Sequence, residues 1–184
     1  MVFGESFPVE KNIIKFKFGT EYRWITGHVS TMHRRLIDIL NTEHTDAIVA
    51  EGVSSYGLAE AATGEVVDYA NITTASILFA VPVEEVRDAP RPKDPFVWVK
   101  KRPERVRVGT GPFNIEGNVY LAEEYKLKDL LLSVRDQFIA VAQAVVTRAD
   151  APEFREEHGV VFVNRSGMDF IMPTPSASSG QDRA

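Results

Sequence analysis

The stretch Ile25-Thr26-Gly27-His28-Val29 decides how this chain is organised, because it returns as Ile115-Glu116-Gly117-Asn118-Val119 about 90 residues later. A turn upstream of it repeats in the same way, since Gly19-Thr20 is followed later by Gly109-Thr110. Self-similarity at one fixed spacing indicates two copies of a small domain. The 184 residues of the chain have room for two domains of roughly 70 residues each.

The residues before each repeated stretch alternate between apolar and charged. Ile14-Lys15-Phe16-Lys17-Phe18 in the first copy and Val106-Arg107-Val108 in the second show the period of two that is typical of a half-buried strand. The glycines Gly27 and Gly117 then interrupt the second strand, where we expect a bulge or a sharp bend. A curved second strand is what a small barrel requires.

The rest of each copy predicts one short helix and three further strands. Leucines at helical spacing predict a helix over residues 36–40 and another over 127–134. The run Asn164-Arg165-Ser166-Gly167 predicts a tight hairpin, because Asn and Gly tolerate positive φ. Five strands in this order predict a closed or nearly closed barrel in each copy. The later strands are expected over residues 47–50, 66–70 and 76–81 in the first copy, and over 138–146, 160–163 and 168–172 in the second.

The same patterns predict which side chains form the hydrophobic core of each copy. Truncating any of its members should cost about 2 to 5 kcal/mol where the side chain is buried. The predicted core residues are Phe16, Phe18, Ile25, Val29, Leu36, Leu40, Ile48 and Phe79 in the first copy, and Val106, Val108, Ile115, Val119, Leu127, Leu131, Ile139 and Phe170 in the second.

These motifs resemble the Sm-like small β-barrel, in which an Ile-x-Gly-x-Val strand follows a Val-x-Val strand and a closing hairpin follows a variable loop. They also resemble an uncharacterised bacterial family of short β domains with the same bent strand and a leucine-rich helical segment. The resemblance implies a mainly β fold with short helices: two tandem Sm-like five-stranded small barrels joined by a Pro-rich basic linker. Of the RNA-binding turn that the family carries, Asn164, Arg165 and Gly167 come near the pattern, and Glu123-Glu124 would repel a phosphate.

The chain divides at its one shift in composition. We expect a first small barrel over residues 12–83, a linker over 84–103 that four prolines stiffen, a second barrel over 104–173, and a disordered tail over 174–184.

Basic and aromatic residues gather in and around this linker. Such a strip could contact phosphates and stack bases. Alternatively, the aromatic residues form a short strand that docks on a barrel while the cations stay solvated, and acidic neighbours dilute the field. The net charge of −5 also lowers the expectation of nucleic-acid binding. The candidate nucleic-acid-binding residues are Arg91, Lys93, Trp98, Lys100, Lys101, Arg102, Arg105 and Arg165.

Other chemistries find little support in the sequence. There is no cysteine, no Gly-x-Ser-x-Gly and no Gly-x-x-x-x-Gly-Lys, and the nearby histidines His28, His33 and His44 fit no ligand spacing. We therefore predict no catalytic residue, no metal site and no cofactor. The chain lacks a long apolar run and its first residues lack the pattern of a signal peptide, so we expect no membrane span and a cytoplasmic location.

Three hypotheses remain. The first is a non-enzymatic interaction or scaffold protein that self-associates, or binds a protein partner, through the edges of its small barrels. The second is an RNA- or DNA-binding module that uses the basic linker. The third is a protein that binds a small ligand between the barrels. The first is preferred because duplication, edge strands and an acidic surface all agree with it.

Overall fold

The computed structural model of this chain describes residues 12–32, 34–42, 46–62, 64–86 and 100–174. The two copies have the same order of elements. The first copy consists of β1 (Asn12–Gly19), β2 (Arg23–Thr31), α1 (Leu36–Leu40), β3 (Ala47–Gly57), β4 (Val66–Thr73), the 3-10 turn η1 (Thr74–Ser76) and β5 (Phe79–Val86). The second consists of β6 (Lys101–Thr110), β7 (Phe113–Ala122), the 3-10 turn η2 (Leu127–Asp129), α2 (Leu130–Ser133), β8 (Phe138–Arg148), β9 (Arg155–Asn164), the 3-10 turn η3 (Arg165–Gly167) and β10 (Phe170–Pro173).

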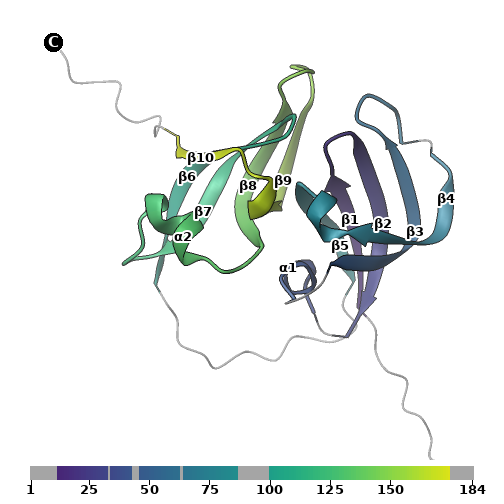
Figure 1. Ribbon diagram of the computed structural model, residues 1–184, viewed down its shortest axis with the longest axis horizontal. Helices are drawn as coiled ribbons and strands as arrows, with labels where there is room; N and C mark the ends of the chain where they lie inside the picture. Colours follow the sequence, from purple (N-terminus) through teal and green to yellow (C-terminus); the bar gives the residue numbers. More distant parts are fainter. Residues whose placement is uncertain (1–11, 33, 43–45, 63, 87–99, 175–184) are drawn as a thin grey trace, which may run out of the picture.

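The strands form one antiparallel ten-stranded sheet in the order β10-β6-β7-β8-β9-β5-β1-β2-β3-β4. Within each copy, the fifth strand pairs with the first and the fourth strand lies at the opposite edge. The two copies lie side by side, with α1 between them and β4 at the far right (Figure 1). The mainly β prediction is confirmed, but the prediction of closed barrels is wrong. A closed barrel would need β4 to pair with β5. The edge of β5 that β4 would need instead pairs with β9 of the second copy.

Alternation along the first strand of each copy is confirmed. Ile14, Phe16 and Phe18 are buried while Lys15 between them points to solvent. The aliphatic side chains therefore face a core, and the charged ones keep their hydration.

The expected irregularity at the repeated glycines is also confirmed. The register between the second and third strands shifts between Thr26 and His28 in one copy, and between Glu116 and Asn118 in the other. A Cβ on Gly117 would lie 2.7 Å from the Ala142 carbonyl oxygen, so only glycine allows the two backbones to approach this closely.

The two helices are short and their leucines face different surroundings. Leu36 and Leu40 of α1 are buried, as is Leu130 of α2. Leu131 is 37% exposed, so its prediction as a core residue is wrong. Phe170 is 38% exposed, and its prediction is wrong as well.

The run after β9 is not the tight hairpin that the sequence predicts. Asn164 has φ −71° and caps η3 by accepting a hydrogen bond from the Ser166 N–H, while β10 pairs with β6 rather than with β9. The turn therefore carries the chain from one edge of the second copy to the other. No helix in the described part of the chain is long and apolar enough to cross a membrane.

Candidate interaction surfaces

The joint between the copies is a strand addition. On the β5 edge, Phe79 pairs with Val163 and Ala80 with Phe162 of β9, and the Asn164 N–H donates to the Leu78 carbonyl at 2.9 Å. Residues far apart in the sequence thus continue one sheet across the boundary between the copies. The chain contains, as part of its own fold, one example of how two such copies bind each other.

Asn164 provides buried polar contacts at this joint. Its side chain is fully buried, and its amide nitrogen donates to the carbonyls of Ile77 at 2.9 Å and Thr74 at 3.3 Å. These bonds satisfy an amide that would otherwise cost free energy to bury. They also fix the position of β9 along β5.

Aromatic side chains from both copies close the joint on one face of the sheet. The ring of Phe79 lies edge-on to Phe113 at 4.9 Å and to Trp24 at 5.8 Å, and Trp24 also contacts Phe154 at 5.6 Å. Edge-to-face contacts of this kind add to the free energy of burying the rings. First-copy residues are in this way part of the hydrophobic cluster of the second copy.

One ion pair also crosses the joint. Lys17 Nζ lies 2.5 Å from Glu156 Oε1 and 4.0 Å from the centroid of the Trp24 ring. The hydrogen bond from His158 lowers the pKa of Glu156 below its ordinary value, the bond from Lys17 lowers it further, and burial opposes both. Burial, with a smaller contribution from Glu156, raises the pKa of Tyr56.

The helix α1 makes a second contact between the copies, with β8. The Asn41 side chain donates to the Phe138 carbonyl at 3.0 Å and accepts from the Phe138 N–H at 2.7 Å. Ile37 of α1 lines a cavity of about 290 Å³ whose other walls, including Ile139 and Ala140, come from the second copy. In the inner joint, β5 of the first copy therefore binds β9 of the second, and α1 of the first copy binds β8 of the second.

The outer edges of the sheet have no such partner among the described residues. There, β4 pairs only with β3, and β10 pairs only with β6. Both edges nevertheless carry exposed apolar side chains, and an edge strand with such residues favours the addition of another strand. These side chains are Val66, Val67 and Tyr69 on β4, Phe170 and Met172 on β10, and Leu131 and Leu132 on the adjoining α2.

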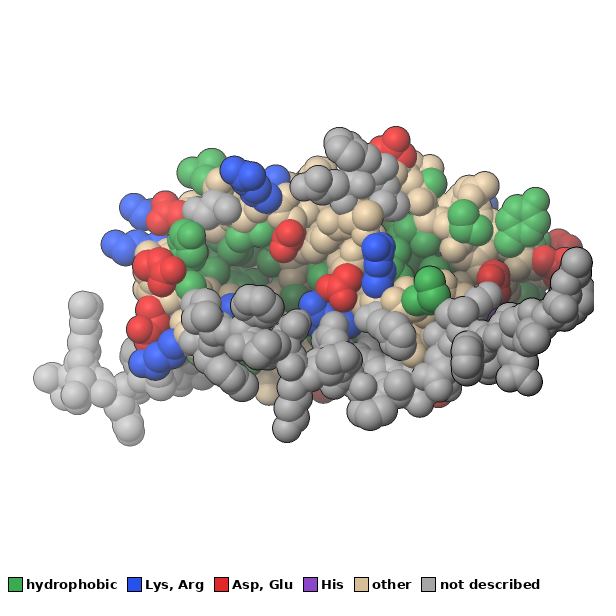
Figure 2. All heavy atoms as spheres, turned by 90° about the horizontal axis from the view of Figure 1, so that it is seen from below, with side chains coloured by type: hydrophobic (Ala, Val, Ile, Leu, Met, Phe, Trp, Pro, Cys, Tyr) green, Lys and Arg blue, Asp and Glu red, His purple; other side chains and the backbone are tan. Residues whose placement is uncertain are grey.

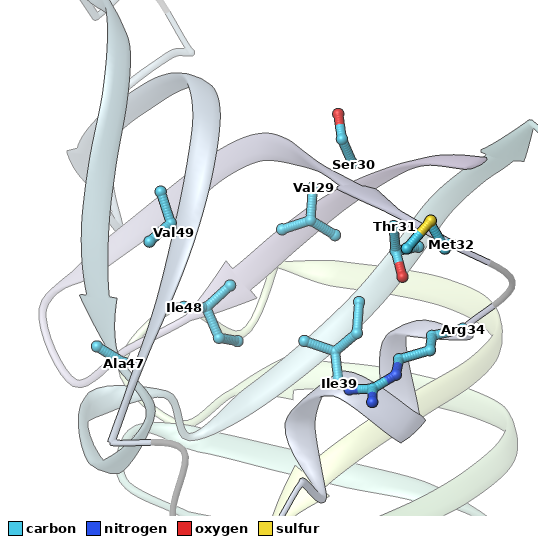
Figure 3. A pocket seen from close by; sticks show the side chains of 9 residues that line it. All are labelled: Val29, Ser30, Thr31, Met32, Arg34, Ile39, Ala47, Ile48 and Val49. Atoms are coloured by element: carbon cyan, nitrogen blue, oxygen red, sulfur yellow. The ribbon is translucent and has the colours of Figure 1, made fainter. Parts of the chain in front are cut away.

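Each outer end also has a hollow. Figure 3 shows the one at the first-copy end, a pocket of about 600 Å³ between β2, α1 and β3, in which Val29, Ile39 and Ile48 point toward one another and Ser30 points away. Its remaining lining residues are Thr31, Met32, Arg34, Ala47 and Val49. At the second-copy end, a groove of about 450 Å³ runs between α2 and β10, lined by Glu104, Leu127, Lys128, Leu131, Phe170, Ile171, Met172 and Pro173.

Carboxylates accompany several of the candidate nucleic-acid-binding residues that the structure describes. Lys100 lies 2.7 Å from Glu123, and Arg102 binds Glu104 and the Tyr125 carbonyl. Figure 2 likewise shows Lys and Arg side chains beside Asp and Glu side chains at the end that carries the second copy.

The other candidates are spread over several places. Lys101 and Arg105 stand on β6, where Arg105 comes within 4.0 Å of Glu116, whereas Arg165 lies in η3. Arg91, Lys93 and Trp98 lie outside the described residues. Within the described part of the chain, no group of three or more His, Asp or Glu side chains could hold a metal ion.

The sequence does not predict the exposure of the apolar residues of β4, β10 and α2, and it places two of them, Leu131 and Phe170, in the core. A signal for them exists in β4, where Val66-Val67-Asp68-Tyr69 has a single charge among apolar residues, whereas β1 alternates apolar residues with lysines. Comparisons with protein-family models, curated proteins and solved structures give no match.

Proposed function

We propose that this chain is a non-enzymatic interaction protein that assembles by strand addition at the outer edges of its sheet. The observation that carries the proposal is the β5–β9 joint, because it uses strand addition to unite two copies of one domain. The outer strands β10 and β4 are the counterparts of β5 and β9. Phe170 and Met172 of β10 are exposed where the joint buries Phe79 and Val81, and β4 exposes Val66, Val67 and Tyr69 along its open edge. Backbone hydrogen bonds from an edge provide affinity, and side-chain pockets beside it provide selectivity.

The membership of each copy in the Sm-like superfamily stays a prediction, as does the cytoplasmic location. The register break at Gly27 and Gly117 supports the first of these.

A peptide of residues 155–165 tests the function, because this segment forms β9, which already adds to β5 within the chain. In the full chain β5 is occupied, so the matching edge left open is that of β10. We expect a fluorescently labelled peptide to gain anisotropy when the full chain is titrated in.

Two controls identify the edge. A peptide with Phe162→Asp should bind much more weakly, and the chain variant Ile171→Pro should lose binding, because proline at this position removes an N–H from the edge strand. Ile171 is the counterpart of Ala80, which pairs with Phe162 in the joint. Equal binding of the original and the Phe162→Asp peptide would contradict strand addition at β10.

A further inference from the structure

We propose that the partner at the outer edges is a second copy of this chain, bound head to tail, with β10 and α2 of one chain against β4 and β3 of the next. The inference rests on the proposed function and names the partner. It follows from comparing each outer end with the side of the inner joint that it matches.

The matching starts from strand pairing. Gly19 pairs with Phe79 as Gly109 pairs with Phe170, and a Cβ on either glycine would lie 2.3 Å from the ring of its phenylalanine. Phe170 therefore occupies in β10 the place of Phe79 in β5. Phe79 is only 1% exposed because the second copy covers it, whereas Phe170 is 38% exposed.

The receiving strand matches as well. Thr73 precedes η1 as Asn164 precedes η3, so Ile72 stands in β4 where Val163 stands in β9. By this register, Phe170 of one chain would pair with Ile72 of the next, as Phe79 pairs with Val163. Strand addition at this end would cover an edge that β4 leaves open.

The helix gives an independent match in the same direction. Within the chain, Ile37 of α1 lies at a cavity walled by β8. The corresponding helix α2 exposes Leu131 by 37% and Leu132 by 89%, and the strand corresponding to β8 is β3, whose Val49 is 63% exposed beside the pocket of Figure 3. By this matching of elements, that pocket lies beside the strand that α2 of a second chain would contact.

The charges are also complementary at this joint. Lys17 of β1 binds Glu156 across the inner joint. The residue that corresponds to Lys17 is Arg107, which within its own chain binds Glu116 at 2.6 Å. The one that corresponds to Glu156 is Glu65, which is exposed immediately before β4. The outer joint therefore keeps a cation on the β10 side and an anion on the β4 side.

The outer joint lacks the residues that make the inner one tight. Trp24, Phe138 and Asn164 correspond to Asn114, Ala47 and Thr73. Less aromatic surface and fewer buried hydrogen bonds would be shared, so this joint is the weaker of the two and its formation depends on protein concentration. Because the two surfaces differ, the contact is heterologous, and its repetition closes into a ring or extends into a filament.

The test is sedimentation velocity of the full chain, alone and as two variants that each block one end. Leu132→Glu blocks the α2 end and Tyr69→Glu blocks the β4 end, and both side chains are exposed enough for the fold to tolerate the change. The wild type should form species larger than 20.5 kDa as its concentration rises, either one closed ring or a ladder. Each variant alone should remain monomeric.

The mixture is the decisive sample. Combining the two variants leaves one intact β4 end and one intact α2 end, so an equimolar mixture should form a dimer of the two different chains and nothing larger. The control Val83→Glu, an equally drastic change at a 63% exposed position of the inner strand β5, should assemble like the wild type. A wild type that stays monomeric, a variant that still self-associates, or a mixture that does not dimerise would each overturn the inference.

The two proposals can fail separately. A monomeric chain that still binds the β9 peptide, and loses it with Ile171→Pro, would retain the strand-addition function and reject the second copy as its partner. A chain that does neither would reject both.

Discussion

Phe79 and Phe170 occupy equivalent positions in the two copies, but only Phe79 is buried, because only the β5 edge has another copy beside it. Both rings lie over a glycine of the first strand of their own copy, yet only Phe79 also packs against an aromatic ring of the other copy, that of Phe113. Phe79→Ala should therefore cost about 3 to 5 kcal/mol of unfolding free energy, because it leaves a cavity in the joint. Urea denaturation of Phe79→Ala and of the matched variant Phe170→Ala measures this, and the second should lose about 1 kcal/mol. Equal losses would show that the second copy contributes little to the burial of Phe79.

Glu156 makes the inner joint sensitive to acid. Its pKa is lowered in the folded chain, so its charge stabilises the fold above the ordinary value of 4.5, and this contribution is lost as the pH falls through the lower folded value. The melting temperatures of the wild type and Glu156→Gln should consequently differ at neutral pH and converge as the pH falls below 4.5 and through the lowered pKa of Glu156. Glu157→Gln, which alters a carboxylate that is 72% exposed, is the matched control and should follow the wild type throughout. A gap that stays constant or widens in acid would exclude a stabilising Glu156 carboxylate.

At the scale of elements, the sequence predicted the strands well and their partners less well. Alternation along β1 and the glycines of β2 and β7 are local signals, and local sterics and burial are enough to realise them. Which strand lies beside β5 depends on contacts between residues about 80 apart, such as Phe79 with Val163, and no local pattern records these. The wrong prediction of a hairpin at Asn164 has the same cause. The composition of residues 164–167 suits a turn, but it does not determine which strand the next segment pairs with.

The sequence predicts assembly through strand edges, which stays a prediction, and it does not name the exposed residues of those edges. The composition of the linker, with its aromatic and basic residues, is a local signal, whereas the exposure of apolar residues on β4 and β10 depends on which strands lie beside them. Equivalent residues such as Phe79 and Phe170 were expected to be equally buried, since a repeat suggests equal surroundings. In a chain of two copies the surroundings are not equal, because β10 at one end and β4 at the other have no further copy beside them.

At the scale of the whole molecule, the exchange of side chains between the two cores implies that the copies unfold together. Trp24, Phe79 and Val81 belong to the cluster of the second copy, while Phe138 and Phe162 belong to that of the first. Neither core is complete when the other copy is unfolded, so the described chain should behave as one cooperative unit.

Differential scanning calorimetry of the full chain that carries both Leu132→Glu and Tyr69→Glu measures this without interference from assembly. One transition is expected, with a ratio of calorimetric to van't Hoff enthalpy of about 1. Adding Phe138→Ala, which removes a second-copy ring from the first-copy core, should move the whole transition to lower temperature, because both copies lose stability through the shared cluster. Two transitions, of which Phe138→Ala shifts one alone, would mean that each copy folds on its own and that the inner joint is a docking contact of two independent domains.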